Sequence, residues 1–274
     1  MNTLEHTPYI WNEKKWYFLS IYYAREKCGK LIVEIIKYYQ EHKNLFCAYF
    51  ISFSKQKGEH LEVTFVSPKN VNNNYSADIQ NYFQNYLDKN TSICMIQFPY
   101  GKAIWCDYPN NSLVWDNFRA TYYSVQYFLL FQSSLFAAVS LNNNDFSENT
   151  SFSIGMYLIS KSLFCIDSIE QKNVISELIH MILKNTKDKH KVENWVNERV
   201  NKYYLDKVSE TLASYKNEIE SEYSEELMNW IYEIKIFLEN KEYKHLYFII
   251  CRITGLTTLN QLVILCLLNK LFYI

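Results

Sequence analysis

The sequence has few of the residues that loosen or break a chain. Among 274 residues there are only 5 Gly and 4 Pro, so we do not expect a long disordered linker. Hydrophobic residues make up 49% of the chain and aromatic residues 17%, with 24 tyrosines. A chain of this length and composition has ample material for one large domain or two small ones.

The sequence also lacks a strong charge of either sign. The formal net charge is -1, and lysine and glutamate are spread along the chain without a basic tail or arm. Nucleic-acid binders carry a clustered positive charge that neutralises phosphates. We therefore expect no nucleic-acid partner.

Long apolar runs are missing as well. The N-terminal segment up to Trp16 has no apolar core and no cleavage site, so it is not a signal peptide. The most apolar run near the end, Leu262–Leu268, is far shorter than the about 20 residues of a membrane span. It predicts a buried helix. We expect a cytoplasmic protein with no membrane partner.

The cysteines form no CxxC pair, and their number, seven, is odd. This pattern predicts buried, reduced thiols. His180 and His190 are ten positions apart, which is not a metal-ligand spacing. We predict no metal and no cofactor. The cysteines are Cys28, Cys47, Cys94, Cys106, Cys165, Cys251 and Cys266.

The stretch around which the chain is organised reads as two strands, Leu45–Phe53 and His60–Val66. Their Phe, Tyr, Ile, Val and Thr residues favour a half-buried pleated surface. The loop between them is charged and contains Gly58, as is common in hairpin connections. We predict a β-hairpin.

The second strand of this hairpin alternates in polarity. Because strand side chains point to opposite faces in turn, His60, Glu62 and Thr64 share one face. The other face is apolar and indicates core. The polar row places an imidazole, a carboxylate and a hydroxyl side by side.

The N-terminal part follows the order β-α-β-β-α-β, which is the ferredoxin-like pattern of an antiparallel sheet covered by helices on one side. We expect the first and third strands to pair. Besides the hairpin, the predicted elements are a strand at Trp16–Ala24, helices at Lys27–His42 and Ser76–Lys89, and strands at Ser92–Phe98 and Lys102–Tyr108.

The C-terminal part reads as a series of helices, so the fold class is α+β. We predict a sheet unit over residues 1–112 and a helical part over residues 113–274 that shares one core with it. The helical segments are Trp115–Leu141, Ser151–Ile166, Ile169–Asn185, His190–Tyr223, Ser224–Asn240, Tyr243–Gly255 and Thr258–Leu271.

The hairpin resembles that of the C-terminal elimination domain of class I lanthipeptide dehydratases, also called the thiopeptide-type bacteriocin biosynthesis domain. In that family the second strand typically reads His-Leu-Arg-Leu-Arg-Phe. Here His60, Leu61 and Phe65 match, whereas Glu62 and Thr64 replace both arginines.

The resemblance continues along the chain. Members commonly carry Glu-x-x-Arg-Tyr-Gly-Gly after the sheet, and here Asp116 and Arg119 keep the acid-x-x-Arg spacing. A phenylalanine-rich segment with a serine pair follows, matched by Phe131–Ser134. Near the end, Asn269–Leu271 matches an Asn-Arg-Leu motif, but the family histidine one turn earlier is absent.

In the dehydratases, as the resemblance implies, this domain eliminates glutamate from glutamylated Ser or Thr, with the strand arginines and the late histidine tied to that step. Guanidinium groups hold a carboxylate bidentately, and Glu62 in that place would repel it. A second branch, the stand-alone thiopeptide pyridine synthases, has diverged at this site. The resemblance therefore implies a pyridine synthase.

Such an enzyme joins two dehydroalanines of a modified precursor peptide in a formal [4+2] cycloaddition, with loss of water and the leader peptide. The step requires no metal or redox cofactor. It needs acid–base groups and close orientation of the two alkenes. The expected partners are the leader-bearing precursor peptide and other enzymes of the pathway.

The candidate residues follow from the polar row and from the positions that the resemblance aligns. We expect His60 and Glu62 to act as catalytic groups, since imidazole can give and take a proton near neutral pH. The other catalytic candidates are Arg119, Tyr122 and Tyr123, and the candidates for substrate binding are Thr64, Asp116 and Ser133.

Two other functions stay open. One is a split dehydratase subunit that eliminates glutamate through other residues, which the missing arginines disfavour. The other is a non-catalytic partner that binds the leader peptide, for example by strand addition at a sheet edge. The polar row favours catalysis over this binding role.

Overall fold

A computed structural model describes the greater part of the chain, and the two compact units in it are treated one at a time. These are a sheet unit, residues 1–135 with 142–147, and a helical unit, residues 136–141 with 148–274. The predicted bounds 1–112 and 113–274, and a shared core, stay a prediction. The described residues are 8–11, 13–54, 58–69, 73–93, 108–116, 146–201, 208, 210–211, 214 and 225–272.

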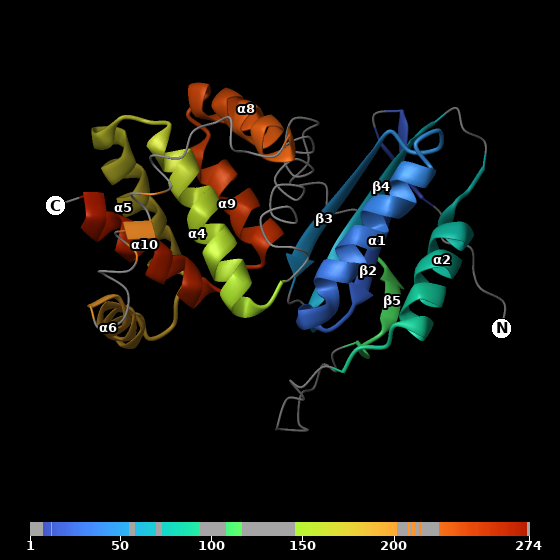
Figure 1. Cartoon of the computed structure of the whole chain (residues 1–274), viewed down its shortest axis with the longest axis horizontal. Coiled ribbons are helices and arrows are strands. Elements are labelled where there is room, and N and C mark those ends of the chain that lie inside the picture. The colour runs from blue at the N-terminus through green and yellow to red at the C-terminus, as the bar shows by residue number, and fades with distance from the viewer. Residues whose placement is uncertain are drawn as a thin grey trace. The chain divides into compact units, whose positions relative to one another are not determined.

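The sheet unit is built on an antiparallel sheet whose central strands are β2 and β4 (Figure 1). β4 pairs with β2 on one side and with β3 on the other, and both β1 and β5 pair with β2. The strands are β1 (Tyr9–Trp11), β2 (Lys14–Tyr22), β3 (Ala48–Ser54), β4 (His60–Pro68) and β5 (Ser112–Trp115).

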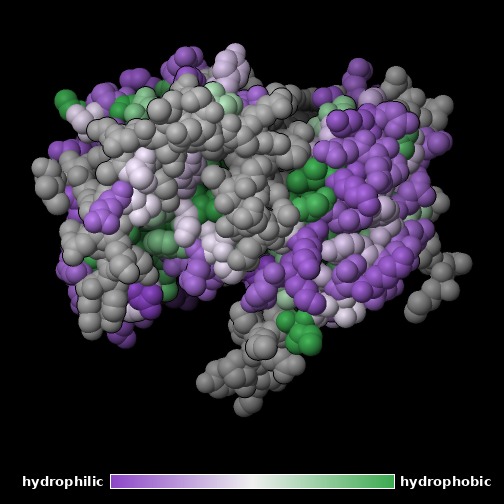
Figure 2. Space-filling model, in the orientation of Figure 1, coloured by the Kyte–Doolittle hydropathy of each residue, from purple (hydrophilic) through white to green (hydrophobic). Residues whose placement is uncertain are grey.

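Helices α1 (Cys28–Glu41) and α2 (Ser76–Lys89) cover the apolar face of this sheet. The Tyr38 ring of α1 lies 5.3 Å from Phe65 of β4 between centroids, and Phe83 of α2 lies 6.0 Å from Phe65. The outward sides of α1 and α2 are hydrophilic (Figure 2). Both helices are thus amphipathic, with one apolar stripe on the sheet.

Burial of the aromatic core has an electrostatic consequence. Desolvation raises the pKa of the Tyr38 and Tyr49 phenols, because burial penalises the charged form. These tyrosines stay protonated and act as packing groups rather than acids.

Most predicted elements of the sheet unit are confirmed. The class is α+β, and the first and third predicted strands pair as β2 and β4. The helices at Lys27–His42 and Ser76–Lys89 are present within a residue or so at each end. The hairpin is present as β3 and β4. The strand predicted at Lys102–Tyr108 and most of Ser92–Phe98 lie outside the described residues.

One prediction is wrong. A helix was expected from Trp115, but Trp115 ends strand β5, which pairs with the middle of β2. The indole Nε1 donates to Gln80 Oε1 of α2 at 2.9 Å, so the sheet and α2 hold this residue extended. The rest of that predicted helix, from residue 117 on, lies outside the described residues.

The helical unit contains α4, α5, α6, α8, α9 and α10 (Figure 1). Apart from the Trp115–Leu141 segment discussed above, the predicted helical segments are confirmed except for much of His190–Tyr223, where α6 is described and most later residues are not. The bounds are α4 (Glu148–Phe164), α5 (Ser168–Lys184), α6 (Lys189–Arg199), α8 (Glu225–Glu239), α9 (Tyr243–Thr254) and α10 (Thr258–Phe272).

Helix α10 contains the apolar run Leu262–Leu268 and, as predicted, is a buried helix that packs on α4, α5 and α6.

Gly155 of α4 allows the Leu256 side chain to pack closely against this helix, since a Cβ at position 155 would lie 2.5 Å from the Leu256 Cδ1. None of the helices in the described parts of the chain has the length and hydropathy that crossing a bilayer requires.

The cysteines are only partly as predicted. Cys28 and Cys251 are buried, and burial raises the pKa of the Cys251 thiol to about 12. Cys47 and Cys165, however, are exposed. Cys47 directly precedes β3 and Cys165 directly follows α4, so each lies where a buried element ends. All the cysteines in the described part of the chain are free thiols.

A buried cation ties the hairpin to the rest of the sheet unit. Arg25, only 7% exposed, places Nη1 3.1 Å from Glu59 Oε1. Its Nε donates to the Phe146 carbonyl at 3.2 Å, and its Cζ lies 4.7 Å from the Phe53 ring centroid. One side chain thereby joins three segments that are distant in sequence.

Replacing Arg25 should be costly. We expect Arg25→Ala to lower the free energy of unfolding by about 3 kcal/mol, because the Glu59 carboxylate would lose its partner in a mostly buried setting. Urea unfolding followed by circular dichroism measures the change. The control is Lys37→Ala, whose exposed ammonium lies 3.9 Å from Glu34, and which should change stability by less than about 1 kcal/mol. Equal losses in the two variants would contradict the anchoring role of Arg25.

Candidate functional site

The candidate site is the polar row of β4 together with the strands on either side of it. Gly58 has a φ of 109°, a conformation that glycine adopts without steric cost. This turn directs the chain into β4, which starts at His60. The row His60, Glu62 and Thr64 lies on the face opposite to α1 and α2, as predicted from the alternation.

His60 is fixed at the start of the row. Its side chain is 2% exposed, and its ring lies 4.5 Å from the Tyr22 ring between centroids. Nδ1 lies 2.8 Å from the Gly58 carbonyl oxygen. A carbonyl only accepts, so Nδ1 carries the hydrogen, and Nε2 of the neutral ring is then an acceptor.

Glu62 faces this acceptor. Its Oε1 lies 4.0 Å from His60 Nε2, and its side chain is 14% exposed. Ser52 Oγ of β3 donates to Glu62 Oε2 at 3.1 Å. The carboxylate is therefore oriented by β3, and its other oxygen, Oε1, is the one that lies near the imidazole nitrogen.

A second carboxylate lies across the neighbouring strand. Ser20 of β2 is opposite Glu62 in the ladder, and its Oγ donates to Asp116 Oδ2. The backbone N–H of Asp116 donates to the Phe18 carbonyl at 2.9 Å. Asp116 thus follows β5 directly and is not on the helix that the sequence predicted. The buried Ser20 therefore has both carboxylates as neighbours: Glu62 is opposite it in the ladder, and Asp116 accepts its hydrogen bond.

Thr64 has a less polar setting than the sequence predicted. It is 4% exposed, and its partners across the ladder are Phe18 and Phe50. The Trp16 ring stacks on both phenylalanines at 6.1 and 6.3 Å between centroids. The polar row therefore passes into an aromatic group at Thr64.

The other predicted site residues lie outside the described residues. They are Arg119, Tyr122, Tyr123 and Ser133. Their roles stay predictions.

Sequence reasoning missed the residues that hold the row in place. Ser20, Ser52 and Tyr22 become neighbours of Glu62 and His60 only through strand register. The one signal in the sequence is that each serine interrupts an aromatic-rich strand. Among the residues that the structure describes, no three His, Cys, Asp or Glu side chains gather as metal ligands.

The arrangement can move protons but is poorly suited to bind an anion. The carboxylates of Glu62 and Asp116 and the imidazole of His60 lie on one face and can accept protons and hydrogen bonds. The buried guanidinium of Arg25 is committed to Glu59, the Phe146 carbonyl and the Phe53 ring. The described part of this face therefore carries the carboxylates of Glu62 and Asp116, and Arg25 is bound elsewhere in the sheet unit.

Comparisons with known proteins give a fold but not a family. No protein-family model matches the chain, and no curated protein matches it. Among solved structures, the pyridine synthase TbtD from thiomuracin biosynthesis is similar, with a TM-score of 0.67 and 13% identity. The match covers 94% of this chain and 97% of the other. The two proteins share their fold.

The contact of His60 with Gly58 makes a spectroscopic prediction. We expect His60 to be the Nδ1–H tautomer when neutral, because Nδ1 is held 2.8 Å from a carbonyl oxygen. Long-range 1H–15N correlation spectra distinguish the two ring nitrogens directly. A His60→Gln variant assigns the signal, and an Nε2–H tautomer would show that the Gly58 contact is absent in solution.

Proposed function

We propose that this protein is a thiopeptide macrocyclase, which forms a central pyridine by formal [4+2] cycloaddition of two dehydroalanines in a modified precursor peptide, with loss of water and the leader peptide. The observation that carries the proposal is the pair of acceptors formed by His60 Nε2 and Glu62 Oε1, 4.0 Å apart, on a fold shared with a pyridine synthase.

The first chemical requirement is a proton shift. One amide must react as its imidic acid, so the proton on its nitrogen must leave and its oxygen must gain one. We assign removal of the proton from the amide nitrogen to Glu62, which is more exposed than His60. His60 is the second proton acceptor. No net proton is consumed, since the proton lost at nitrogen appears at oxygen.

The oxygen side requires a donor. Arg119, Tyr122 and Tyr123 are the candidates that the sequence offers for it. Asp116, held by Ser20, is available to orient such a cation or a substrate N–H. Thr64 and Ser133 complete the proposed contacts with substrate. The aromatic group around Thr64 would border flat azole rings, which pack well on aromatic faces.

The later steps expel water and then the leader as an amide. A proton held by His60 can be returned to the departing hydroxyl, because imidazole acts as acid once it has acted as base. Orientation of the two alkenes provides the remaining acceleration. In well-oriented intramolecular reactions, orientation lowers the activation barrier by roughly 7–11 kcal/mol.

Glutamate elimination is the less favourable function for this face. A glutamyl group would bring a third carboxylate toward Glu62 and Asp116, where hydrogen-bonded carboxylates already face it. The elimination requires the opposite sign of charge at these positions.

The proposal extends to the setting of the enzyme. We propose that the sheet unit is a ferredoxin-like β-α-β-β-α-β unit, which the pairing of β2 with β4 and β5 supports. The protein would act in the cytoplasm on a leader-bearing precursor peptide, after the pathway enzymes that install azoles and dehydroalanines.

The test uses the purified protein and a synthetic leader peptide fused to a core with thiazoles and two dehydroalanines. Liquid chromatography with mass spectrometry should detect the leader as an amide and a core lighter by the leader and one water. If this substrate is bound but unchanged, the protein is a leader-binding partner. A second assay uses a glutamylated peptide. Release of glutamate from it would show that the protein catalyses elimination rather than macrocyclisation.

Variants then test the site. His60→Gln and Glu62→Gln should each lower kcat roughly 10²–10⁴-fold, the usual contribution of general acid–base groups. The matched controls are His245→Gln and Glu41→Gln, both exposed and outside the polar row. Full activity in either site variant would refute the assigned roles.

A further inference from the structure

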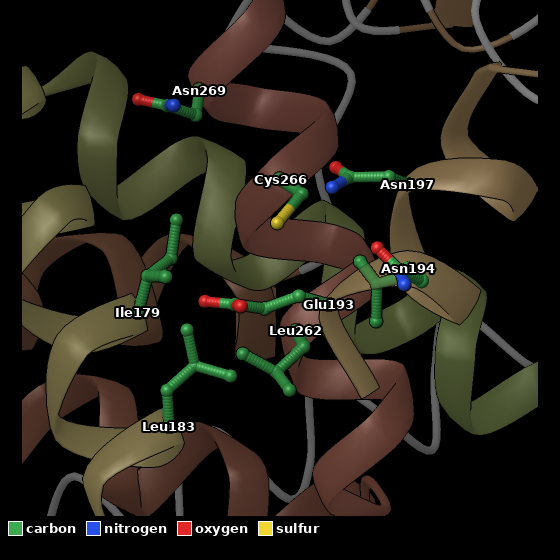
Figure 3. Close-up of a pocket in the computed structure, with 9 residues that line it drawn as sticks. Ile179, Leu183, Glu193, Asn194, Asn197, Leu262, Cys266 and Asn269 are labelled. Carbon is green, nitrogen blue, oxygen red and sulfur yellow. The ribbon is translucent and has the colours of Figure 1, made fainter. Parts of the chain in front are cut away.

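The helical unit contains a pocket that the proposed reaction does not use. It lies between α5, α6 and α10 and has a volume of about 300 Å³, at the lower end of the range for small-molecule sites. Figure 3 shows the side chains around it. The lining residues are Ile179, Leu183, Glu193, Asn194, Val196, Asn197, Leu262, Cys266 and Asn269.

The lining is divided by polarity. Aliphatic side chains from α5 and α10, among them Ile179, Leu183 and Leu262, supply an apolar surface. Helix α6 supplies Glu193 and the amides of Asn194 and Asn197. In Figure 3 the Glu193 carboxylate is directed toward the side where Ile179 and Leu183 lie. The pocket thus combines an apolar surface with several hydrogen-bond acceptors.

Glu193 supplies the only ionised group among the described lining residues. Burial raises the pKa of the Cys266 thiol and outweighs the lowering by Lys270, and Glu193 adds a smaller raising effect, so the thiol is neutral. Lys189 Nζ and His190 Nδ1 lie 3.8 and 3.7 Å from the Glu193 carboxylate. Both partners are well exposed, and such pairs are worth little. A cation that enters the pocket can therefore compete with them.

We propose that this pocket binds an aliphatic primary ammonium group. The alkyl chain lies on Ile179, Leu183 and Leu262, and the ammonium donates to the Glu193 carboxylate, which is directed toward these side chains (Figure 3). A primary ammonium has three N–H donors and a carboxylate has two acceptor oxygens, so the two groups can form charge-assisted hydrogen bonds. The same chemistry is present in a peptide lysine side chain and in a free alkylamine.

The cysteines provide the readout. Hexylamine should slow alkylation of Cys266 by iodoacetamide in the native protein, and should leave the exposed Cys47 and Cys165 unaffected. Mass spectrometry of tryptic peptides measures each rate. Hexanoate, with a similar chain and the opposite charge, should give no protection. Nα-acetyl-lysine methylamide represents a peptide lysine side chain, and hexylamine represents a free alkylamine. Protection by only one of them identifies which of these two ligands the pocket binds.

A matched pair of variants tests the charge. Glu193→Gln keeps the shape but should weaken hexylamine protection roughly 10–100-fold, as for loss of a charged hydrogen-bond partner. Glu198→Gln, on the exposed side of α6, should leave it unchanged. Equal protection by hexylamine and hexanoate, no protection by either amine, or full protection in Glu193→Gln would overturn the proposal. The comparison of hexylamine with hexanoate needs no variant at all.

Discussion

The register of β4 between β2 and β3 is the constraint on which the candidate site depends. Glu62 has Ser20 on one side and Ser52 on the other only because β4 pairs in one register with both neighbours. A shift by one residue would move the whole row to the other face. The apolar face prevents this shift, since Leu61, Val63 and Phe65 would then leave the core under α1 and α2. Burial of the apolar side chains of β4 thus fixes the strand register, and the register determines where His60, Glu62 and Thr64 lie.

The same reasoning separates what the sequence could predict from what it could not. The alternation from His60 to Phe65 predicts which side chains share a face, and the helical spacing of Leu31, Ile32 and Ile35 predicts α1. Both are local patterns. The Ser20 and Ser52 contacts, the ion pair of Arg25 with Glu59 and the strand β5 join distant segments. Trp115 looks helical in its own sequence context, but pairing with β2 and the bond to Gln80 decide otherwise.

The electrostatics of the polar face limit the chemistry more than the fold does. A fold shared with a pyridine synthase at 13% identity is compatible with many reactions, because function resides in the site. The described face carries Glu62 and Asp116, each with a serine donor. Serine donors lower the cost of placing a carboxylate in a poorly solvated setting. Such a face suits cationic, neutral or N–H-bearing groups, and the amide that would lose a proton in the proposed macrocyclisation is one of them.

In the proposed reaction, the unequal exposure of Glu62 and His60 determines the order in which the two side chains would act. His60 is 2% exposed and Glu62 14%, so the substrate amide of the proposed reaction would meet the carboxylate first. The Gly58 carbonyl occupies Nδ1 of His60, which leaves Nε2 as the only ring atom able to take a proton. That atom faces Glu62 across 4.0 Å, too far for a direct hydrogen bond. In the proposed reaction, a proton taken up by Glu62 would supply the donor that this gap lacks, and His60 Nε2 is the acceptor nearest to it on the imidazole ring.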